Sequence, residues 1–390
     1  MRQFERVFIL VIDSLGIGEL PDAADYGDVG ANTLRHVAEA TPELRLPNLR
    51  CLGLGNIVPV PGVPPADNPI TAYGKMREQS VGKDSTTGHW ELAGIILKEP
   101  FPVYPNGFPD ELIKEFERVI GRHIIGNVAA SGTEIIGKLG DQHMRTGRPI
   151  VYTSVDSVFQ IACHEDVIPL DELYNMCRKA RAILTPPHNI SRVIARPFRG
   201  VPGNFIRTEG RRDFSLPPIE KTVLEAAAEA GGVLAIGKTE DLFANKGITR
   251  AQHTVTDKSG LRALARAVEE AQEILTFANV VDLDMVYGHR NNTAGYAKGL
   301  ELIDEALEPV IKALRKKDIL FITADHGNDP TTPGTDHTRE YVPIIGFSPS
   351  FSSGVNLGVR DTFADLAATV SEILNLDYQC PGTSFAGLLP

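Results

Sequence analysis

Carboxylate and imidazole side chains gather in four stretches of the sequence, three of them at the ends of apolar runs that suit buried strands. The candidates are Asp13, Asp284, His289, Asp325, His326 and His337. Parallel strands end at one edge of an α/β sheet, so residues that follow different strands can meet there. Carboxylates and imidazoles without thiolates favour Mn²⁺, Zn²⁺ or Fe²⁺ over Ca²⁺ or a structural zinc ion. The pattern therefore predicts a metal site built at strand ends.

Each of these positions has an ordinary alternative when it is taken alone. An Asp after a strand is more often a turn former or a helix cap than a ligand. The string from Asp325 to Asp329 contains Gly and Asn, and this composition is also typical of a turn. The combination carries the prediction, because strand ends that lie far apart in the sequence converge only in three dimensions.

A hydroxyl-rich segment, Gly82–Leu92, precedes an expected helix. A hydroxyl at a helix N-terminus faces free backbone N–H groups and the positive end of the helix dipole. A nearby divalent metal would help to remove its proton and make it a nucleophile. The alternative is that Ser85 or Thr86 only caps the helix.

Short apolar runs alternate with amphipathic stretches along much of the chain, which predicts an α/β fold with a mostly parallel sheet and helices on both faces. The expected strands are Val7–Ile12, Val233–Ile236, Asn279–Leu283, Ile319–Thr323 and Val342–Phe347. Residues 99–217 are rich in Pro and Gly. We interpret them as a smaller α/β domain inserted into a core of residues 1–98 and 218–390.

Composition excludes several classes of function. The chain has 390 residues, with 39 Lys and Arg against 50 Asp and Glu, for a net charge of −11. An acidic protein is a poor partner for a nucleic-acid backbone. Val7–Ile12 is too short for a signal sequence or a membrane span. The four cysteines form no Cys-x-x-Cys pair, which is typical of a cytoplasmic protein with reduced thiols.

Five segments together resemble the prokaryotic phosphopentomutases, a family of the alkaline phosphatase superfamily. The resemblance runs in order from near the first residue to the last expected helix. It rests on Asp13 after its strand, Lys83-Asp84-Ser85-Thr86-Thr87-Gly88-His89-Trp90-Glu91, Val281-Asp282-Leu283-Asp284-Met285-Val286-Tyr287-Gly288-His289-Arg290, Thr323-Ala324-Asp325-His326-Gly327-Asn328-Asp329 and Thr335-Asp336-His337-Thr338-Arg339-Glu340.

The resemblance implies an alkaline-phosphatase-like catalytic core that holds two divalent ions, expected to be Mn²⁺. It assigns one ion to Asp284, His289 and His337, and the other to Asp13, Asp325 and His326. Three carboxylates bring −3 against +4 from the two ions, which leaves a positive charge suited to a phosphoryl group. The phosphorylated position falls on Ser85. The family usually has Thr at that position, so Thr86 stays open as an alternative.

The implied activity is the interconversion of ribose 1-phosphate and ribose 5-phosphate, and of their 2-deoxyribose equivalents. It would run through a phosphoenzyme and a 1,5-bisphosphate, with ribose or glucose bisphosphate as an activator. Pentose phosphates are then the only expected partners, without nucleic acid or membrane, and the sequence leaves the oligomeric state open. Residues 99–217 would form a cap that binds substrate and excludes water. The substrate candidates are Ser154, Asp156, Arg192, Arg196, Arg207 and Lys238.

Four alternatives are weighed against this reading. A cofactor-independent phosphoglycerate mutase would share the metal core, but its motifs lack Gly88-His89-Trp90. A phosphatase would result if water reached the phosphoenzyme, whereas a sulfatase would need a Cys-x-Pro-x-Arg motif that the sequence does not contain. A binding protein with a degenerate site would lack some of the six ligand positions or the hydroxyl, and all are present.

Overall fold

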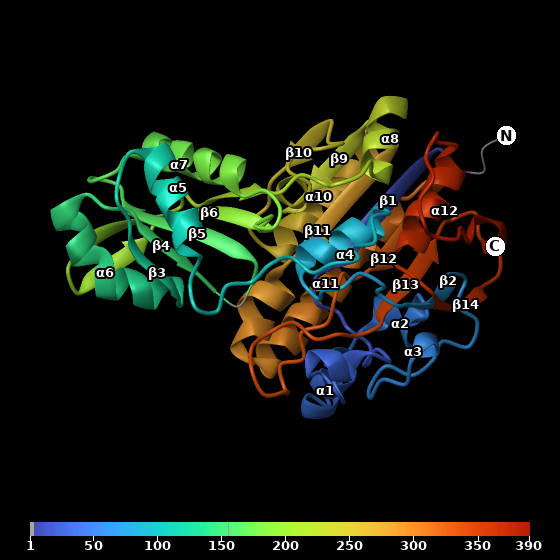
Figure 1. The fold of residues 1–390 in the computed structure, drawn as a ribbon. Helices are drawn as coiled ribbons and strands as arrows, with labels where there is room; N and C mark the ends of the chain where they lie inside the picture. The colour runs from blue at the N-terminus through green and yellow to red at the C-terminus, as the bar shows by residue number, and fades with distance from the viewer. Residues whose placement is uncertain (1–3, 155) are drawn as a thin grey trace. The chain divides into compact units, whose positions relative to one another are not determined.

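The computed structural model describes residues 4–154 and 156–390. Two compact units form: a core unit, which runs to Glu99 and resumes over Pro218–Pro390, and an inserted unit, Pro100–Pro217. Figure 1 shows both, with the inserted unit in the green part of the colour range. The α/β class expected from the sequence is confirmed.

The core unit is built on an eight-stranded sheet within the described residues. Its strands, in spatial order, are β10 (Arg250–Gln252), β9 (Val233–Ile236), β11 (Leu275–Val280), β1 (Arg6–Ile12), β12 (Asp318–Thr323), β13 (Val342–Phe347), β2 (Ala72–Met76) and β14 (Val355–Arg360). β1 pairs in parallel with β11 and β12, and all seven of its residues are buried. A strand between two others, with helices on both faces, needs a continuous apolar run, and this is what the sequence provides.

Helices cover both faces of the core sheet. One group contains α1 (Thr33–Ala40), α2 (Pro47–Cys51), α10 (Asp257–Glu270) and α11 (Thr293–Ala313); the other contains α4 (Ser85–Leu92), α8 (Val223–Ala230), α9 (Thr239–Leu242) and α12 (Ala364–Leu374). The short α3 (Leu54–Ile57) lies beside β2. β11 illustrates the two faces, because Phe277 contacts the rings of His89 and Phe243, whereas Val280 lies against Gly260 of α10.

Two strand predictions need correction. The expected strand Asn279–Leu283 is shifted, since β11 ends at Val280 and residues Leu283–Tyr287 form a π-helix. The carboxylate of Asp257 accepts the N–H groups of Val281 and Asp282, so this backbone leaves the sheet. Val342–Phe347 is a strand, but it runs antiparallel to both neighbours. An apolar run reports burial on two faces and carries no information about direction.

The inserted unit has its own mixed sheet and its own core. Its strands are β3 (Ile125–Ala129), β4 (Ile150–Thr153), β5 (Val158–His164), β6 (Arg192–Val201) and β7 (Asn204–Arg207), with β8 (Arg212–Ser215) paired to β6. Helices α5 (Asp110–Ile120) and α7 (Leu170–Ile183) pack into one apolar cluster. Helix α6 (Gly132–Thr146) packs into a second cluster with Ile150, Tyr152 and Phe198.

Over the described parts of both units, every helix is too short or too polar to cross a membrane.

Candidate metal centre

The first group of predicted ligands forms at the ends of two neighbouring strands. Asp13 follows β1 and Asp325 follows β12 after one residue, and these strands pair in parallel. His326 Nε2 lies 3.4 Å from Asp13 Oδ1 and 3.4 Å from Asp325 Oδ2. All three side chains are buried, and one ligand atom of each lies within 4.8 Å of the others. The structure therefore brings together three residues that are separated by up to 313 positions in the sequence.

The chemistry of this first group fits a divalent cation. Asp13 Oδ1 is buried and accepts no hydrogen bond from the described residues. Burial, together with the negative charges of Asp325 and Asp284, raises the pKa of Asp13 well above its ordinary value. Burial also lowers the pKa of His326, which favours the neutral imidazole that a metal requires. His326 Nδ1 donates to the carbonyl of Gly327 at 3.0 Å, so Nε2 is left for the ion.

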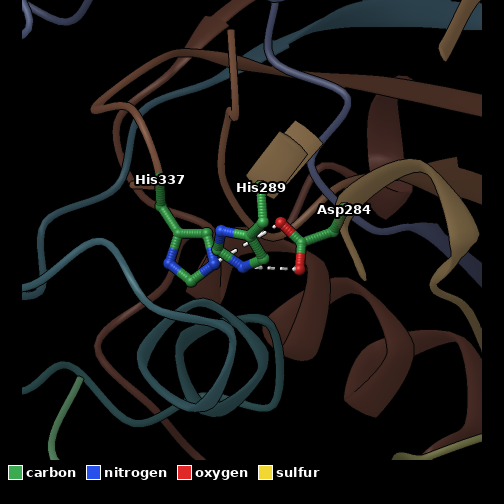
Figure 2. Close-up of side chains that lie close together, drawn as sticks. All are labelled: Asp284, His289 and His337. Carbon is green, nitrogen blue, oxygen red and sulfur yellow. Dashed lines mark ion pairs between the residues drawn. The ribbon is translucent and has the colours of Figure 1, made fainter. Parts of the chain in front are cut away.

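The second group consists of Asp284, His289 and His337 (Figure 2). His289 Nε2 lies 3.2 Å from Asp284 Oδ2, and His337 Nε2 lies 3.4 Å from Asp284 Oδ1. Burial would raise the pKa of Asp284, but the two histidines outweigh it and hold that pKa well below its ordinary value. His289 Nδ1 contacts the carbonyl of Thr335 at 2.6 Å, which directs Nε2 toward Asp284.

The two groups are adjacent. The rings of His326 and His337 lie 4.0 Å apart between centroids, and the charge of Asp284 contributes to the raised pKa of Asp13. Two clusters of carboxylates and imidazoles in contact suit a pair of divalent ions that act on one phosphoryl group. This arrangement of the six predicted ligands is the central feature of the core unit.

Ser85 is the first residue of α4 and adjoins the first group. Its Oγ lies 3.1 Å from His326 Nε2. Asp84 caps the helix by accepting the N–H groups of Thr86 and Thr87 at 3.0 and 3.2 Å, so neither hydroxyl residue is the cap. Thr86 is buried, at 1% exposure, whereas Ser85 is partly exposed.

The string Gly88-His89-Trp90-Glu91 binds α4 to the core unit. A Cβ on Gly88 would lie 2.2 Å from the carbonyl oxygen of Asp325, so only Gly permits this approach. Trp90 Nε1 donates to the carbonyl of Leu242. Glu91 is fully buried and accepts hydrogen bonds from the N–H groups of Gln79, Ser80 and Phe363 and from the Thr362 hydroxyl. The string thus fixes where Ser85 lies.

Several residues near the centre received no role from the sequence. Asn328 Nδ2 donates to Asp284 Oδ1 at 2.7 Å. Lys83 lies two residues before Ser85 in the sequence. Its Nζ lies 3.0 Å from Asp28 and 3.4 Å from Asp336. His89 and Asn279 contact the first group. The only available signal was proximity in sequence, since Lys83 and His89 flank Ser85 and Asn328 lies in the Asp325 string.

Lys238 belongs with the metal groups. It precedes α9 in the core unit, and its Nζ lies 3.2 Å from the sulfur of Met285. Met285 directly follows Asp284 in the sequence. The positive charge of Lys238 lowers the pKa of Asp13, although the net shift of that pKa is upward.

The other predicted substrate residues lie in the inserted unit and form separate groups. Arg192 Nη2 lies 3.7 Å from Asp156 Oδ2. Among the described residues, Ser154 lines a cavity of about 520 Å³ together with Val103, Pro105, Ala129, Ala130 and Ser131.

Arg196 and Arg207 lie near the buried Tyr152. Burial raises the pKa of Tyr152, and the arginines oppose that shift. Arg207 Nη2 donates to Thr133 Oγ1 at the start of α6, while Arg196 Nε donates to Gln160. A cationic, donor-rich group of side chains of this kind suits an anion.

Known proteins that resemble this chain include metalloenzymes and phosphopentomutases. The family model of the Metalloenzyme superfamily matches residues 5–378. The phosphopentomutase of Caldanaerobacter subterraneus subsp. tengcongensis is 58% identical over 387 residues, covering 99% of this chain and 98% of that protein. The phosphopentomutase of Dictyoglomus thermophilum is 55% identical over 382 residues, with coverages of 98% and 97%. A solved structure of Leishmania mexicana phosphoglycerate mutase covers 97% of each chain, with a TM-score of 0.48 at 15% identity. With relatives this similar over almost its whole length, the chain is an enzyme of the phosphopentomutase family, within the alkaline phosphatase superfamily of metalloenzymes.

Proposed function

We propose that this enzyme interconverts ribose 1-phosphate and ribose 5-phosphate, and the 2-deoxyribose pair, through a phosphorylated Ser85 and a 1,5-bisphosphate. The observation that carries the proposal is the hydroxyl of Ser85, 3.1 Å from His326 Nε2 at the edge of two adjoining carboxylate–imidazole groups. The phosphopentomutases that are 58% and 55% identical supply the substrate class.

Two divalent ions would be held by the two groups, with Asp13, Asp325 and His326 around one ion and Asp284, His289 and His337 around the other. When bound, such ions neutralise phosphoryl charge and lower the pKa of a nearby hydroxyl. We propose Mn²⁺ because mixed carboxylate and imidazole donors suit it.

Ser85 would carry the phosphoryl group between the two ends of the sugar. In the first transfer, the bond from phosphorus to Ser85 Oγ breaks and a bond to the free sugar hydroxyl forms, while the proton of that hydroxyl ends on Ser85 Oγ. In the second transfer, the other phosphate of the bisphosphate returns to Ser85. The N-terminus of α4 favours negative charge at this position. No water is consumed, so the reaction is an isomerisation.

A ribose or glucose bisphosphate would prime the enzyme, because the cycle starts only after Ser85 is phosphorylated. Either compound can donate one phosphate and leave as a monophosphate. We therefore expect activation by either compound in enzyme that has been dephosphorylated.

The inserted unit would hold the part of the substrate that is not reacting. Arg196 and Arg207, with the hydroxyl of Tyr152, offer donors to a phosphate. Asp156, Arg192 and Ser154 offer partners for sugar hydroxyls. Lys238, in the core unit, would bind a phosphate near the ions.

Arg207→Gln should raise KM for ribose 1-phosphate, while Arg118→Gln, at an exposed pair with Glu115, should leave KM unchanged.

The decisive experiment follows two products from ribose 1-phosphate with Mn²⁺ and a trace of bisphosphate. Fast formation of ribose 5-phosphate with little free phosphate is expected. Free phosphate as the main product would make the enzyme a hydrolase on the same centre. Neither product, with metal shown to be bound, would contradict the assigned substrate.

A further inference from the structure

Two buried polar side chains, His89 and Asn279, connect the residues of the first ligand group to the backbone of Ser85. Asn279 Nδ2 lies 3.1 Å from Asp13 Oδ2 and 2.9 Å from His89 Nε2. His89 Nδ1 lies 2.8 Å from the carbonyl oxygen of Ser85 and 3.0 Å from Asp325 Oδ2. His89 is 0% exposed and Asn279 is 1% exposed, so water does not compete for these contacts.

The partners fix the proton positions along this chain. A carboxylate accepts, so the Asn279 group that faces Asp13 must be its NH₂ group. The same NH₂ group has a second proton, which points to His89 Nε2, and Nε2 therefore accepts. The proton of His89 is then on Nδ1, where it donates to the carbonyl of Ser85. With this arrangement, every donor along these contacts faces an acceptor.

These contacts join four elements at the point where the paired strands β1, β11 and β12 meet the N-terminus of α4. Asp13 follows β1, Asn279 lies in β11, His89 lies in α4 and Asp325 follows β12. We infer that His89 and Asn279 are positioning residues, which hold Asp13, Asp325 and the first turn of α4 at the spacing required for metal binding and phosphoryl transfer at Ser85. The inference rests on the proposed function for the transfer step, and on the geometry alone for the metal site.

The effect should be confined to one of the two sites. The hydrogen bonds of His89 and Asn279 reach Asp13 and the carbonyl of Ser85, and His89 lies beside Asp325. In contrast, the hydrogen bond to Asp284 comes from Asn328. Partners that orient metal ligands typically change metal affinity by about 10–100-fold when they are removed. A loss restricted to the Asp13–Asp325–His326 site would therefore separate positioning from general destabilisation.

The chain offers a matched control. His143 is also fully buried, donates from Nδ1 to the carbonyl of Arg148 and accepts the N–H of His164 at Nε2. It belongs to the inserted unit, whereas all six candidate ligands belong to the core unit. His143→Ala thus removes a buried histidine with the same hydrogen bonds, far along the chain from the metal groups.

The test is titration of the metal-free full-length protein with Mn²⁺ by calorimetry, beside thermal unfolding and steady-state kinetics. In His89→Ala and Asn279→Leu, one of the two Mn²⁺ sites should weaken by about 10–100-fold while the other is unchanged. kcat should fall with KM for ribose 1-phosphate unchanged. His89→Asn retains a donor near the Nδ1 position and should recover part of the lost affinity. His143→Ala should lose thermal stability and keep both affinities.

Several results would overturn the inference: equal weakening of both sites, no weakening at all, or no recovery in His89→Asn. Asn279→Leu preserves side-chain volume and carries the test if His89→Ala does not fold. The proposed function is judged separately on the wild-type enzyme. Isomerisation by the wild type with unaltered Mn²⁺ affinity in the variants would remove the inference and leave the function. A wild-type protein that binds two Mn²⁺ ions but does not isomerise ribose 1-phosphate would remove the proposed function and leave the inference about the metal site.

Discussion

Ser85 Oγ lies 3.1 Å from His326 Nε2, although 241 positions separate the two residues in the sequence. The contact joins the N-terminus of α4 to the loop that follows β12. A hydroxyl in this position meets the positive end of a helix dipole and the imidazole of a candidate metal ligand. The same contact distinguishes Ser85 from Thr86, which is the next residue and is buried.

Ser85→Ala should lower the rate of isomerisation by at least about 10³-fold, because it removes the atom that carries the phosphoryl group. Fold and Mn²⁺ affinity should change little, since the capping hydrogen bonds of α4 come from Asp84. The measurement combines steady-state kinetics with mass spectrometry of the phosphorylated peptide. Thr86→Ser is the control and should remain active. Substantial activity in Ser85→Ala would move the nucleophile to Thr86.

His337→Ala tests how the ligands are divided between the ions. His337 Nε2 lies beside Asp284 Oδ1, so the site shared with His289 should lose Mn²⁺ affinity by at least about tenfold more than the other site. Titration of the metal-free protein resolves the two sites. His253→Ala removes an exposed histidine paired with Glu240 and should leave both affinities unchanged. Equal losses at the two sites in His337→Ala would contradict the proposed division.

The α/β fold could be predicted from local signals, and so could the meeting of Asp13 and Asp325 at strand ends, whereas the grouping of all six candidate ligands came from the resemblance to a known family. Buried strands read as apolar runs, and polar residues directly after them must lie at one sheet edge. The direction of β13 could not be predicted, because an antiparallel strand inside the sheet is as apolar as a parallel one. The end of β11 depends on the carboxylate of Asp257, which lies 24 residues before Val281 and gives no local sign.

The neighbours of the candidate ligands were harder to predict from the sequence than the candidate ligands themselves. Asn279 reads from sequence as an ordinary strand residue, and His89 as part of a helix. Their hydrogen bonds to Asp13 and to the Ser85 carbonyl exist only because β11 and α4 pack together. The string Gly88-His89-Trp90-Glu91 was recognised as specific to the family. Its structural role, the packing of α4 against Asp325, Leu242 and Phe363, could not be seen in the sequence.

Gly88→Ala should disturb the centre from a position that binds nothing. The added Cβ would lie 2.2 Å from the carbonyl oxygen of Asp325, a backbone atom, so α4 or the Asp325 loop must move. We expect a loss of about 1–3 kcal/mol in the free energy of unfolding, together with weaker Mn²⁺ binding. Urea unfolding and metal titration measure the two effects.

Gly137→Ala is the matched control for Gly88→Ala. Gly137 lies inside α6, with no heavy atom within 4 Å of an added Cβ among the described residues. Ala is the better helix former, so the free energy of unfolding should rise by up to about 1 kcal/mol. A Gly88→Ala protein that is as stable and as metal-bound as Gly137→Ala would show that the close approach of α4 to Asp325 is not required.

Asp13→Asn should stabilise the metal-free protein at neutral pH while it weakens the first metal site. Burial, with Asp325 and Asp284 nearby, raises the pKa of Asp13 in the folded chain above its ordinary value of 3.8. The folded state therefore holds this proton more tightly than the unfolded state, and stability from this group falls as pH rises from 3.8 to the raised pKa. Asn does not titrate, and its carbonyl can still accept from Asn279. The advantage of Asp13→Asn in Tm should thus grow with pH across this window, measured by thermal unfolding in chelator.

Addition of Mn²⁺ should reverse the order, because the wild type gains binding energy that the Asn variant lacks. Asp361→Asn is the control, since the Asp361 side chain is 81% exposed and its replacement should give a small Tm difference that does not grow with pH. A pH-independent difference between wild type and Asp13→Asn would show that Asp13 is already ionised in the folded, metal-free protein. The three carboxylates would then coexist as anions without a cation, and the charge argument for two divalent ions would lose its main support.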